Sequence, residues 1–326
     1  MINYRLAKNT DLFNMCDLWN EVVNNDGFYK PFTHKDYQMK MESDPNFSYD
    51  RVFLAFDKEK LVGFLILVVR SGNNKTAFIS ALLTKKEYRE KGIASHLLNE
   101  AESWAKDNDF ETLLATNFLP SCYSWYIPNT NKHDHPCAPG IRINSDLYFF
   151  YLHHRFDAYA YQDAFHLNLS DYEISPKIQK ILDKNKTNGY TIELYDKNKH
   201  FGIDEFCQEL NIYDFEKVIK ENLALDKPYP FLVILKDNKV VGWTGAMWNE
   251  ESGRGHFDGI ANLPSVRGLG LGKALFSMLA LYSKNNGAKF MTFYTGLTNP
   301  ARNIYMDSGF KIVQSFCAMK KTLKKE

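Results

Sequence analysis

The residues with the clearest chemical potential form a glycine-rich turn in the C-terminal half of the chain. The segment Arg267-Gly268-Leu269-Gly270-Leu271-Gly272 follows an expected strand, Phe257–Ala261, and precedes an amphipathic helix expected over Lys273–Lys284. Glycine accepts positive φ angles and lets a ligand touch the backbone, because it has no Cβ. Unpaired N–H groups at the start of a helix attract anions, and the helix dipole strengthens this attraction. The turn is therefore suited to hold a phosphate group, although a plain strand–helix connection would also use glycine.

Two common phosphate-binding patterns do not fit this turn. A P-loop, G-x-x-x-x-G-K-[ST], would need glycine in place of Arg267 and a hydroxyl residue in place of Ala274. A dinucleotide fingerprint, G-x-G-x-x-G, would need its third glycine in place of Lys273. The spacing therefore argues against both nucleotide-binding classes.

The turn occurs twice in the chain. A second copy, Arg89-Glu90-Lys91-Gly92-Ile93-Ala94, precedes an amphipathic helix expected over Ser95–Asp107. Upstream of each turn an expected β-hairpin carries a similar segment, Lys60-Leu61-Val62-Gly63-Phe64 in the first half and Lys239-Val240-Val241-Gly242-Trp243 in the second. Two spaced matches at nearly one offset indicate two copies of one structural unit.

Both halves predict the same order of elements: strand, helices, hairpin, long strand, glycine turn, helix, strand, helix and strand. This order predicts an α/β (α+β) layered fold, and 326 residues fit two domains. We expect the boundary in the turn-rich segment Asn185–Asn188, which gives domains 1–184 and 185–326. The first half has extra residues in a stretch rich in proline and aromatic residues, 118–141. We expect that stretch to be a long loop, either a lid or a domain-packing segment.

The two turns match [RQ]-x-x-G-x-[GA], the pyrophosphate-binding pattern of the Gcn5-related N-acetyltransferase (GNAT) family. The residues that carry the match are Arg267, Gly270 and Gly272 in one half and Arg89, Gly92 and Ala94 in the other. A later family segment, Asn-x-x-Ala followed by Tyr and Gly-Phe, is similar to Asn299–Phe310. The chain thus resembles tandem two-domain GNAT proteins, the architecture to which mycothiol synthase belongs. This resemblance implies acyl-CoA N-acyltransferase domains, each a mixed central sheet flanked by helices, with acetyl-CoA as the cosubstrate and a small-molecule primary amine as the acceptor.

The resemblance also implies which residues bind acetyl-CoA. In the C-terminal half they lie at the end of the strand, in the turn and at the start of the last helix: Ala261, Asn262, Arg267, Gly268, Leu269, Gly270, Leu271, Gly272, Lys273, Asn299, Ala301, Arg302 and Tyr305. In the N-terminal half the corresponding contacts come from Arg89, Gly92 and Ala94.

Acetyl transfer to an amine needs a base, because an alkylamine with a pKa near 10 is almost fully protonated at neutral pH. GNAT proteins often draw this base from the strand before the turn. There, alternation places His256 and Asp258 on one face, whereas the N-terminal half has Phe78 and Ser80, which cannot act as a base. We therefore expect the C-terminal half to be catalytic and the N-terminal half to be degenerate. A hydrogen-bonded polar pair without a catalytic role is the alternative reading of His256 and Asp258.

Further candidates follow from the same comparison. Tyr305 matches the family tyrosine that faces the CoA sulfur and acts as the general acid, although Tyr151 holds the equivalent place in the first half. Glu250 and Glu251, in the hairpin before the strand, are weaker candidates for the base.

Metal binding is not expected. His133, His135 and Cys137 lie close together in the 118–141 stretch, but they lack a helical or paired-cysteine frame. Five scattered cysteines without a CxxC pair argue against a disulfide framework and against structural zinc.

The overall charge and hydropathy narrow the possible partners. A formal net charge of +1 gives no general attraction to nucleic acid or anionic lipid. No apolar run is long enough for a membrane span, and no signal peptide is recognisable. We expect a cytoplasmic monomer or homodimer. Two alternatives to an N-acetyltransferase remain open: a non-catalytic acyl-CoA-binding regulatory module, and acyl transfer to a hydroxyl or thiol.

Overall fold

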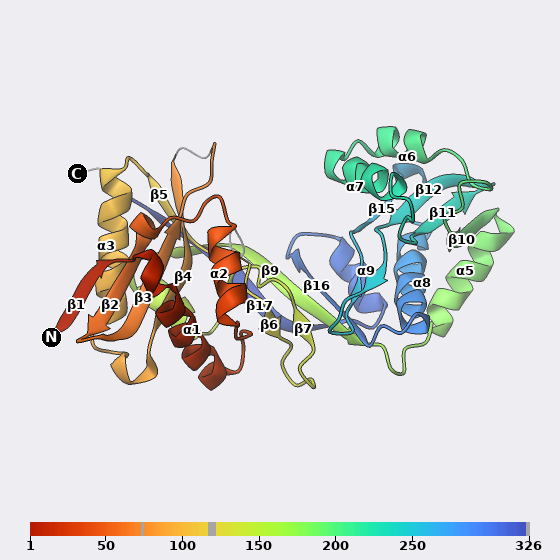
Figure 1. The fold of residues 1–326 in the computed structure, drawn as a ribbon. Coiled ribbons are helices and arrows are strands. Elements are labelled where there is room, and N and C mark those ends of the chain that lie inside the picture. Colours follow the sequence, from red (N-terminus) through yellow and green to blue (C-terminus); the bar gives the residue numbers. More distant parts are fainter. Residues whose placement is uncertain (73–74, 117–121, 324–326) are drawn as a thin grey trace. The chain divides into compact units, whose positions relative to one another are not determined.

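The computed structural model describes residues 1–72, 75–116 and 122–323. The chain divides into two compact units, each a sheet with helices packed on it (Figure 1). Unit 1 consists of Met1–Ala164, Tyr294–Leu297 and Val313–Glu326, and unit 2 consists of Phe165–Phe293 and Thr298–Ile312. The fold class expected from the sequence is confirmed.

The larger sheet is mixed and has the order β1-β2-β3-β4-β5-β17-β9-β16; most of its strands belong to unit 1, and β16 (Phe290–Gly296) has residues in both units. Unit 1 alone contributes β1 (Ile2–Leu6), β2 (Val52–Asp57), β3 (Lys60–Val68), β4 (Thr76–Thr84) and β5 (Thr112–Ala115). Strands β9 (Asp157–Asn168) and β17 (Lys311–Thr322) each have residues in both units. The helices are α1 (Leu12–Asp26), α2 (His34–Glu42), α3 (Ile93–Asp107) and α4 (Asp146–His153), and three short strands are β6 (Trp125–Tyr126), β7 (Asp134–His135) and β8 (Ile141–Arg142).

Helices cover both faces of this sheet because its central strands are apolar on both sides. Residues of β3 from Leu61 to Val68 are all buried. Leu97, Leu98 and Ala101 of α3 are fully buried in one core cluster with alternate residues of β3 and β4. Met15 and Trp19 of α1 pack in a second cluster with the intervening strand residues. A strand buried on both faces is the expected result of a nearly continuous apolar run.

Unit 2 repeats this plan with a smaller sheet in the order β10-β11-β12-β15. Its strands are β10 (Tyr190–Leu194), β11 (Leu232–Lys236), β12 (Lys239–Thr244), β15 (Ile260–Asn262) and β16 (Phe290–Gly296), with a small hairpin of β13 (Trp248–Asn249) and β14 (Gly255–His256). Its helices are α5 (Pro176–Thr187), α6 (Ile203–Leu210), α7 (Tyr213–Leu223), α8 (Leu271–Asn285) and α9 (Ala301–Asp307).

The last strand of the chain completes the sheet of unit 1. β17 pairs antiparallel with β5, with Met319 opposite Ala115 and Thr322 opposite Thr112. It also pairs with β8, where Phe316 lies opposite Arg142. The division of the chain therefore differs from a single boundary after residue 184, since unit 1 ends at Ala164 and regains residues near the C-terminus.

The segment Asn185–Asn188, expected as a linker, forms the end of α5 and its cap. Asn185 is buried, because the last turn of α5 packs against the turn at Leu269 in the same unit. None of the helices in the described ranges is long and apolar enough to cross a membrane.

One expectation from the cysteine count is wrong. Cys122 and Cys137 form a disulfide that closes most of the 118–141 stretch into a loop. The scattered spacing gave no signal for this bond, because the two cysteines approach each other only through the fold of the loop. Residues 118–121 of the stretch lie outside the described part of the chain.

Candidate active site

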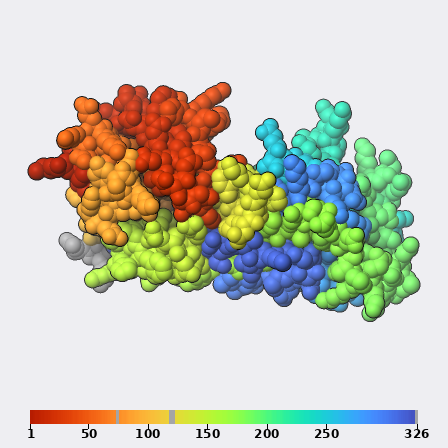
Figure 2. All heavy atoms as spheres, turned by 90° about the horizontal axis from the view of Figure 1, so that it is seen from below, coloured from red at the N-terminus to blue at the C-terminus, as the bar shows by residue number. Residues whose placement is uncertain are grey.

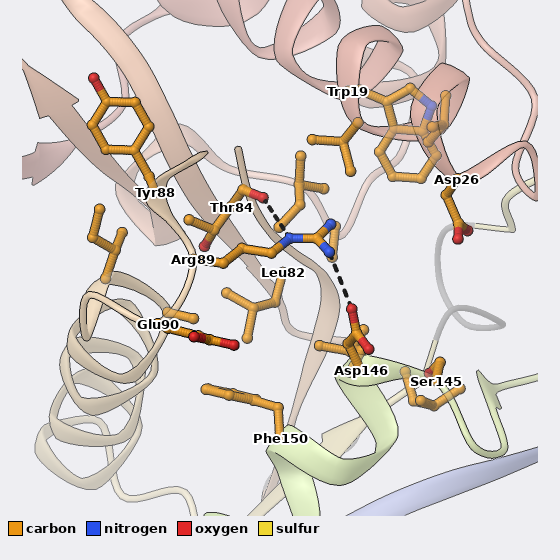
Figure 3. Close-up of a pocket in the computed structure, with 18 of the residues that line it drawn as sticks. Trp19, Asp26, Leu82, Thr84, Tyr88, Arg89, Glu90, Ser145, Asp146 and Phe150 are labelled. Carbon is orange, nitrogen blue, oxygen red and sulfur yellow. Dashed lines mark hydrogen bonds and ion pairs between the residues drawn. The ribbon is translucent and has the colours of Figure 1, made fainter. Parts of the chain in front are cut away.

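A cavity opens in unit 1 where two neighbouring strands separate. β4 and β5 run parallel and pair from Thr76 to Ile79, after which β4 continues to Thr84 with only β3 beside it. The opening leads into a cavity of about 420 Å³, within the size range of small-molecule sites. Its walls come from α1, the end of β4, the turn before α3, β8 and α4 (Figure 3).

The glycine turn of unit 1 forms part of this wall and is open to a ligand. Gly92, with φ of 78°, is the N-cap of α3, and a Cβ added there would meet no atom within 4 Å. Among the described residues, none accepts a hydrogen bond from the N–H groups of Ile93, Ala94 or Ser95. Three unpaired N–H groups at a helix start beside a cavity are suited to bind an anion. Anion binding by this motif stays a prediction.

The side chains of Arg89 and Asp146 meet at the mouth of the cavity, between the glycine turn and α4. The Arg89 guanidinium donates from Nη1 to Asp146 Oδ2 at 3.1 Å and from Nε to the Thr84 carbonyl at 3.4 Å (Figure 3). Asp146 is the first residue of α4, after the N-cap Ser145. Because Asp146 is almost fully exposed, this pair adds little stability, and Arg89 can exchange it for another anion.

In unit 2, helix α5 contacts the equivalent turn at Gly270. Gly270 has the same φ of 78°, but a Cβ added there would lie 3.0 Å from Cδ1 of Ile181 on α5. Asn185, one turn later on α5, donates from Nδ2 to the Leu269 carbonyl at 3.1 Å. The residues of α5 form part of the surface of unit 2 (Figure 2). Ile181 and Asn185 of this helix contact the turn at Gly270 and Leu269, while Arg267 and Gly268 stay exposed.

The first N–H groups of α8 also have partners within unit 2. The Asn262 side chain, in its hydrogen-bonded orientation, accepts from the Gly272 N–H at 3.2 Å and donates to the Ala261 carbonyl at 2.8 Å. The Lys273 N–H is bonded to the Gly270 carbonyl. Thr84 holds the position of Asn262 in unit 1, and its Oγ1 makes no hydrogen bond among the described residues. The N–H groups of Gly272 and Lys273 thus have hydrogen-bond partners within unit 2. The equivalent N–H groups of unit 1, those of Ala94 and Ser95, have none among the described residues.

Side-chain size also separates the two units. In unit 2, Phe257, Phe276 and Phe293 contact one another at ring-centroid distances of 5.5 Å. At the same offset from the motif arginine, unit 1 has the smaller residues Ile79, Leu98 and Ala115. Three phenylalanines therefore fill the region of unit 2 that corresponds to the separation of β4 and β5. A second cavity, of about 400 Å³, lies near Ser277 and Ser308, and no residue of Arg267–Lys273 lines it.

His256 and Asp258, the predicted base residues, are brought together. His256 Nε2 lies 2.9 Å from Asp258 Oδ1, and His256 Nδ1 lies 3.3 Å from Glu250 Oε1. The His256 ring stacks on Trp248 at 3.6 Å, and Arg254 forms an ion pair with Glu250. Burial acts to lower the pKa of His256, but hydrogen bonds to Asp258 and Glu250 outweigh it and raise that pKa above 6.5.

The strand that carries the pair is interrupted rather than continuous. β14 ends at His256 and β15 begins at Ile260. Between them, the backbone of Asp258 lies against Gly245, where an added Cβ would be 2.2 Å from the Asp258 nitrogen. Glu251, the other weak candidate, is exposed at the hairpin tip.

Tyr305, the predicted acid, lies in a different cluster. It is buried against Phe276 and Phe293 at centroid distances of 4.8 and 4.3 Å, and burial raises its pKa to about 12. Phe257, between His256 and Asp258 in the chain, contacts this aromatic cluster, whereas His256 contacts Trp248. The structure therefore does not bring the predicted acid and base into contact. Tyr151 of unit 1 is also fully buried, which raises its pKa, and it does not line the cavity.

The other predicted cofactor residues of unit 2 have structural contacts. Asn299 Oδ1 accepts from the Ala301 N–H at 2.9 Å at the start of α9. The Arg302 guanidinium lies 5.5 Å from the centroid of the Phe165 ring, and Lys273 forms an ion pair with Asp307. Arg267 and Gly268 remain accessible, and Leu271 is buried.

The His and Cys residues of the loop do not assemble into a metal site. Cys137 is in the disulfide, and its N–H donates to His135 Nδ1 at 3.0 Å. Within the described residues, no group of three or more His, Cys, Asp or Glu side chains has a geometry that could hold a metal.

Several cavity residues were not singled out from the sequence. Trp19 and Asp26 lie on one face of α1, and Arg142 and Asp146 lie at β8 and at the start of α4. None of them belongs to a motif.

Comparison with known proteins agrees with the repeated architecture. The model of the acetyltransferase (GNAT) family matches residues 19–122 and again 183–310. A search of curated proteins gives no match. Among solved structures, the GCN5-related glucosamine N-acetyltransferase region of a fungal multi-domain GH3 β-N-acetylglucosaminidase has a TM-score of 0.64 at 15% identity. That match covers 98% of this chain and 38% of the fungal one.

Two further solved structures match over nearly their whole length. A tandem GNAT protein from the clavulanic acid biosynthesis pathway has a TM-score of 0.61 at 14% identity, covering 100% of both chains. A GCN5-related N-acetyltransferase from Sphaerobacter thermophilus has a TM-score of 0.61 at 13% identity, covering 99% of this chain and 96% of the other. At these identities the likeness concerns the fold.

Proposed function

Because the chain belongs to the acetyltransferase (GNAT) family, in its tandem two-domain form, we propose that it transfers the acetyl group of acetyl-CoA to the primary amine of a small molecule, and that acetyl-CoA binds in the cavity of unit 1. The observation that carries this location is the contrast between the two turns. The turn at Gly92 is open and borders a cavity, whereas the turn at Gly270 is covered by Ile181.

The residues of unit 1 fit the parts of the cosubstrate. The N–H groups of Ile93, Ala94 and Ser95 would hold phosphate oxygens, each contributing about 1.5–3 kcal/mol as a hydrogen bond to a charged group. Arg89 would exchange its exposed partner Asp146 for phosphate. The edge of β4 beyond Ile79, which β5 leaves unpaired, offers backbone groups to the pantetheine chain and to the thioester carbonyl.

The acetyl transfer itself places few demands on the protein beyond position and charge. The amine must lose a proton before it attacks, which costs about 4 kcal/mol at pH 7 for a pKa near 10. The carbonyl oxygen gains charge as the nitrogen approaches, so a backbone N–H facing it lowers the barrier. The sulfur then leaves and takes up a proton.

A second location, unit 2, is favoured by one observation. His256 and Asp258 are hydrogen-bonded as the sequence predicts for a base in this half. Catalysis there would require α5 to move away from Gly270 and the aromatic side chains around Tyr305 to open. The assignment of His256, Asp258 and Tyr305 as catalytic residues stays a prediction.

A matched pair of substitutions separates the two locations. Ala94 and Gly272 hold the same position of the motif, two residues after the N-cap glycine of α3 and α8. A glutamate at either position puts a carboxylate where phosphate would lie, and a helix start favours acidic residues. At Gly272 the added Cβ would lie 2.8 Å from the Asn262 side chain, so that side chain must shift. Gly270→Glu is less informative, because the positive φ and Ile181 would disturb folding without any ligand.

Calorimetry with acetyl-CoA and a thiol-release assay over a panel of amines give the readout. We expect Ala94→Glu to weaken acetyl-CoA binding by at least tenfold and Gly272→Glu to leave it nearly unchanged. The reverse result would place the cosubstrate in unit 2. Tight binding of acetyl-CoA without thiol release for any amine, hydroxyl or thiol acceptor would instead identify a regulatory binding module.

A further inference from the structure

The cavity of unit 1 contains a second charged pair, apart from Arg89 and Asp146. Arg142 Nη2 donates to Asp26 Oδ1 at 3.2 Å, and both residues line the cavity. Asp26 is the last residue of α1, and Arg142 is the last residue of β8. The guanidinium carbon of Arg142 lies 4.4 Å from the centroid of the Phe28 ring, which holds the side chain in place.

The position of Asp26 is unfavourable for the helix alone. The C-terminal end of a helix carries partial negative charge and stabilises cations rather than carboxylates. The last turn of α1 has no basic residue, and among the described residues the ion pair of this carboxylate is with Arg142. A carboxylate placed against the helix dipole at the wall of a cavity indicates a purpose other than the stability of α1.

The pair leaves most of its hydrogen-bonding capacity unused. Among the described residues, the Arg142 side chain makes one hydrogen bond, through Nη2, and the Asp26 side chain accepts one, at Oδ1. A guanidinium has five N–H donors, and an ionised carboxylate has two acceptor oxygens. Both groups are partly exposed, with side-chain accessibilities of 29% and 40%, so they can contact a molecule in the cavity without first breaking their own pair.

Resting on the proposed function, we propose that the acceptor is a zwitterion, an amine with a carboxylate on the same or the adjacent carbon, as in an amino acid. Asp26 Oδ2 holds its ammonium group, and the remaining N–H groups of Arg142 hold its carboxylate. The 3.2 Å between the two protein groups matches the short separation of these charges in such a molecule. Arg142 is a specificity-determining residue, because bidentate guanidinium–carboxylate contacts select this group.

The reaction balances with acetyl-CoA as the only co-reactant. The ammonium releases one proton to solvent, and its nitrogen forms a bond to the acetyl carbon as a second N–H proton is lost. The carbon–sulfur bond breaks, and the sulfur leaves as the thiol with that second proton. The products are an N-acetylated acid and free CoA.

The test compares each of the twenty protein amino acids with its decarboxylated amine in the thiol-release assay. We expect at least one amino acid to be used with a kcat/KM at least tenfold above that of its amine. Arg142→Gln should remove this preference by raising KM for the amino acid, with acetyl-CoA affinity within about twofold of the unsubstituted protein.

A matched control is available in the same unit. Arg5 pairs with Asp11 at 2.7 Å and lies 4.5 Å from the Phe56 ring, so it repeats the surroundings of Arg142 away from the cavity. Arg5→Gln should keep the preference for the amino acid.

Three outcomes overturn the proposal. Equal or better use of the decarboxylated amines does so while leaving the proposed acetyltransferase intact. A preference that survives Arg142→Gln does so as well, because the selectivity would then come from another residue. Absence of thiol release with every acceptor removes the proposed function and this inference together, and calorimetry with acetyl-CoA distinguishes that case from the first two.

Discussion

Replacement of Glu250 by glutamine tests whether the charged cluster of unit 2 is a stabilising network. Burial alone would raise the pKa of Glu250, but hydrogen bonds from His256 and Arg254 lower it from 4.5 to about 2. A glutamine keeps the shape of the side chain and removes the charge. At neutral pH, the shift corresponds to about 3 kcal/mol of folding free energy. Since 28% of the side chain is exposed, solvent screening lowers the expected loss to about 1–2 kcal/mol.

The sign of the pH dependence follows from the direction of the shift. A carboxylate with a lower pKa in the folded state stabilises the protein fully above its ordinary value of 4.5 and progressively less as the pH falls toward 2. The difference between Glu250→Gln and the unsubstituted protein should therefore shrink by about half or more between pH 7 and pH 3. His256 acts in the opposite sense: its raised pKa stabilises the folded state below pH 6.5 and is lost as the pH rises through the folded value.

Denaturant unfolding at pH 7 and pH 3 measures the effect, and hydrogen exchange in α8 assigns it to unit 2. Glu251→Gln is the control, because Glu251 is the next residue, is exposed and makes no ion pair among the described residues. The reasoning is refuted if both variants lose the same stability, or if the loss in Glu250→Gln is as large at pH 3 as at pH 7.

Two further predictions concern the two halves of the repeat. Tyr305→Phe and Tyr151→Phe should each change kcat by less than about threefold, because both tyrosines are buried and neither lines the cavity of unit 1; a fall of about 10²–10⁴ in Tyr305→Phe alone, the size expected for loss of a general acid, would return catalysis to unit 2. Asn185→Ala should lower the free energy of unfolding by about 1–3 kcal/mol, because it removes a buried side-chain donor to the carbonyls of Ile181 and Leu269. Asn188→Ala, which changes an exposed asparagine, is the control in denaturant unfolding, and an equal effect of the two changes would show that α5 does not hold the turn.

Local elements were predictable from the sequence because their signals are local. Helices α3 (Ile93–Asp107) and α8 (Leu271–Asn285) form where their amphipathic patterns predict them, and both glycine turns adopt the positive φ that their motif requires. The contact of His256 with Asp258 was also predictable from their spacing. It forms even though the expected strand is interrupted after β14 and resumes only at β15.

The state of each turn could not be predicted, because it depends on residues far away in the sequence. The amphipathic pattern of α5 predicts a packed helix but does not say that Ile181 packs on Gly270. The unpaired N–H group of Ala94 has no acceptor at Thr84, whereas the equivalent Gly272 N–H is bonded to Asn262. The motif comparison favoured the C-terminal half because it contained more family residues, whereas an open cavity depends on how distant segments such as α1, β8 and α4 are placed.

The pairing of β17 with β5 has a consequence for protein synthesis. The strand that pairs with β5 is synthesised after most of unit 2, so the sheet of unit 1 stays incomplete while the second half is translated. At 5–20 residues per second, the interval between the synthesis of β9 and β17 is roughly 10–30 s. Throughout it, the edge of β5, with Leu113 and Ala115, lacks its partner and offers unpaired backbone groups to other chains. The first half of this repeat therefore reaches its final structure only after the second half has been made, and a ribosome-associated chaperone that shields β5 would raise the yield of folded protein.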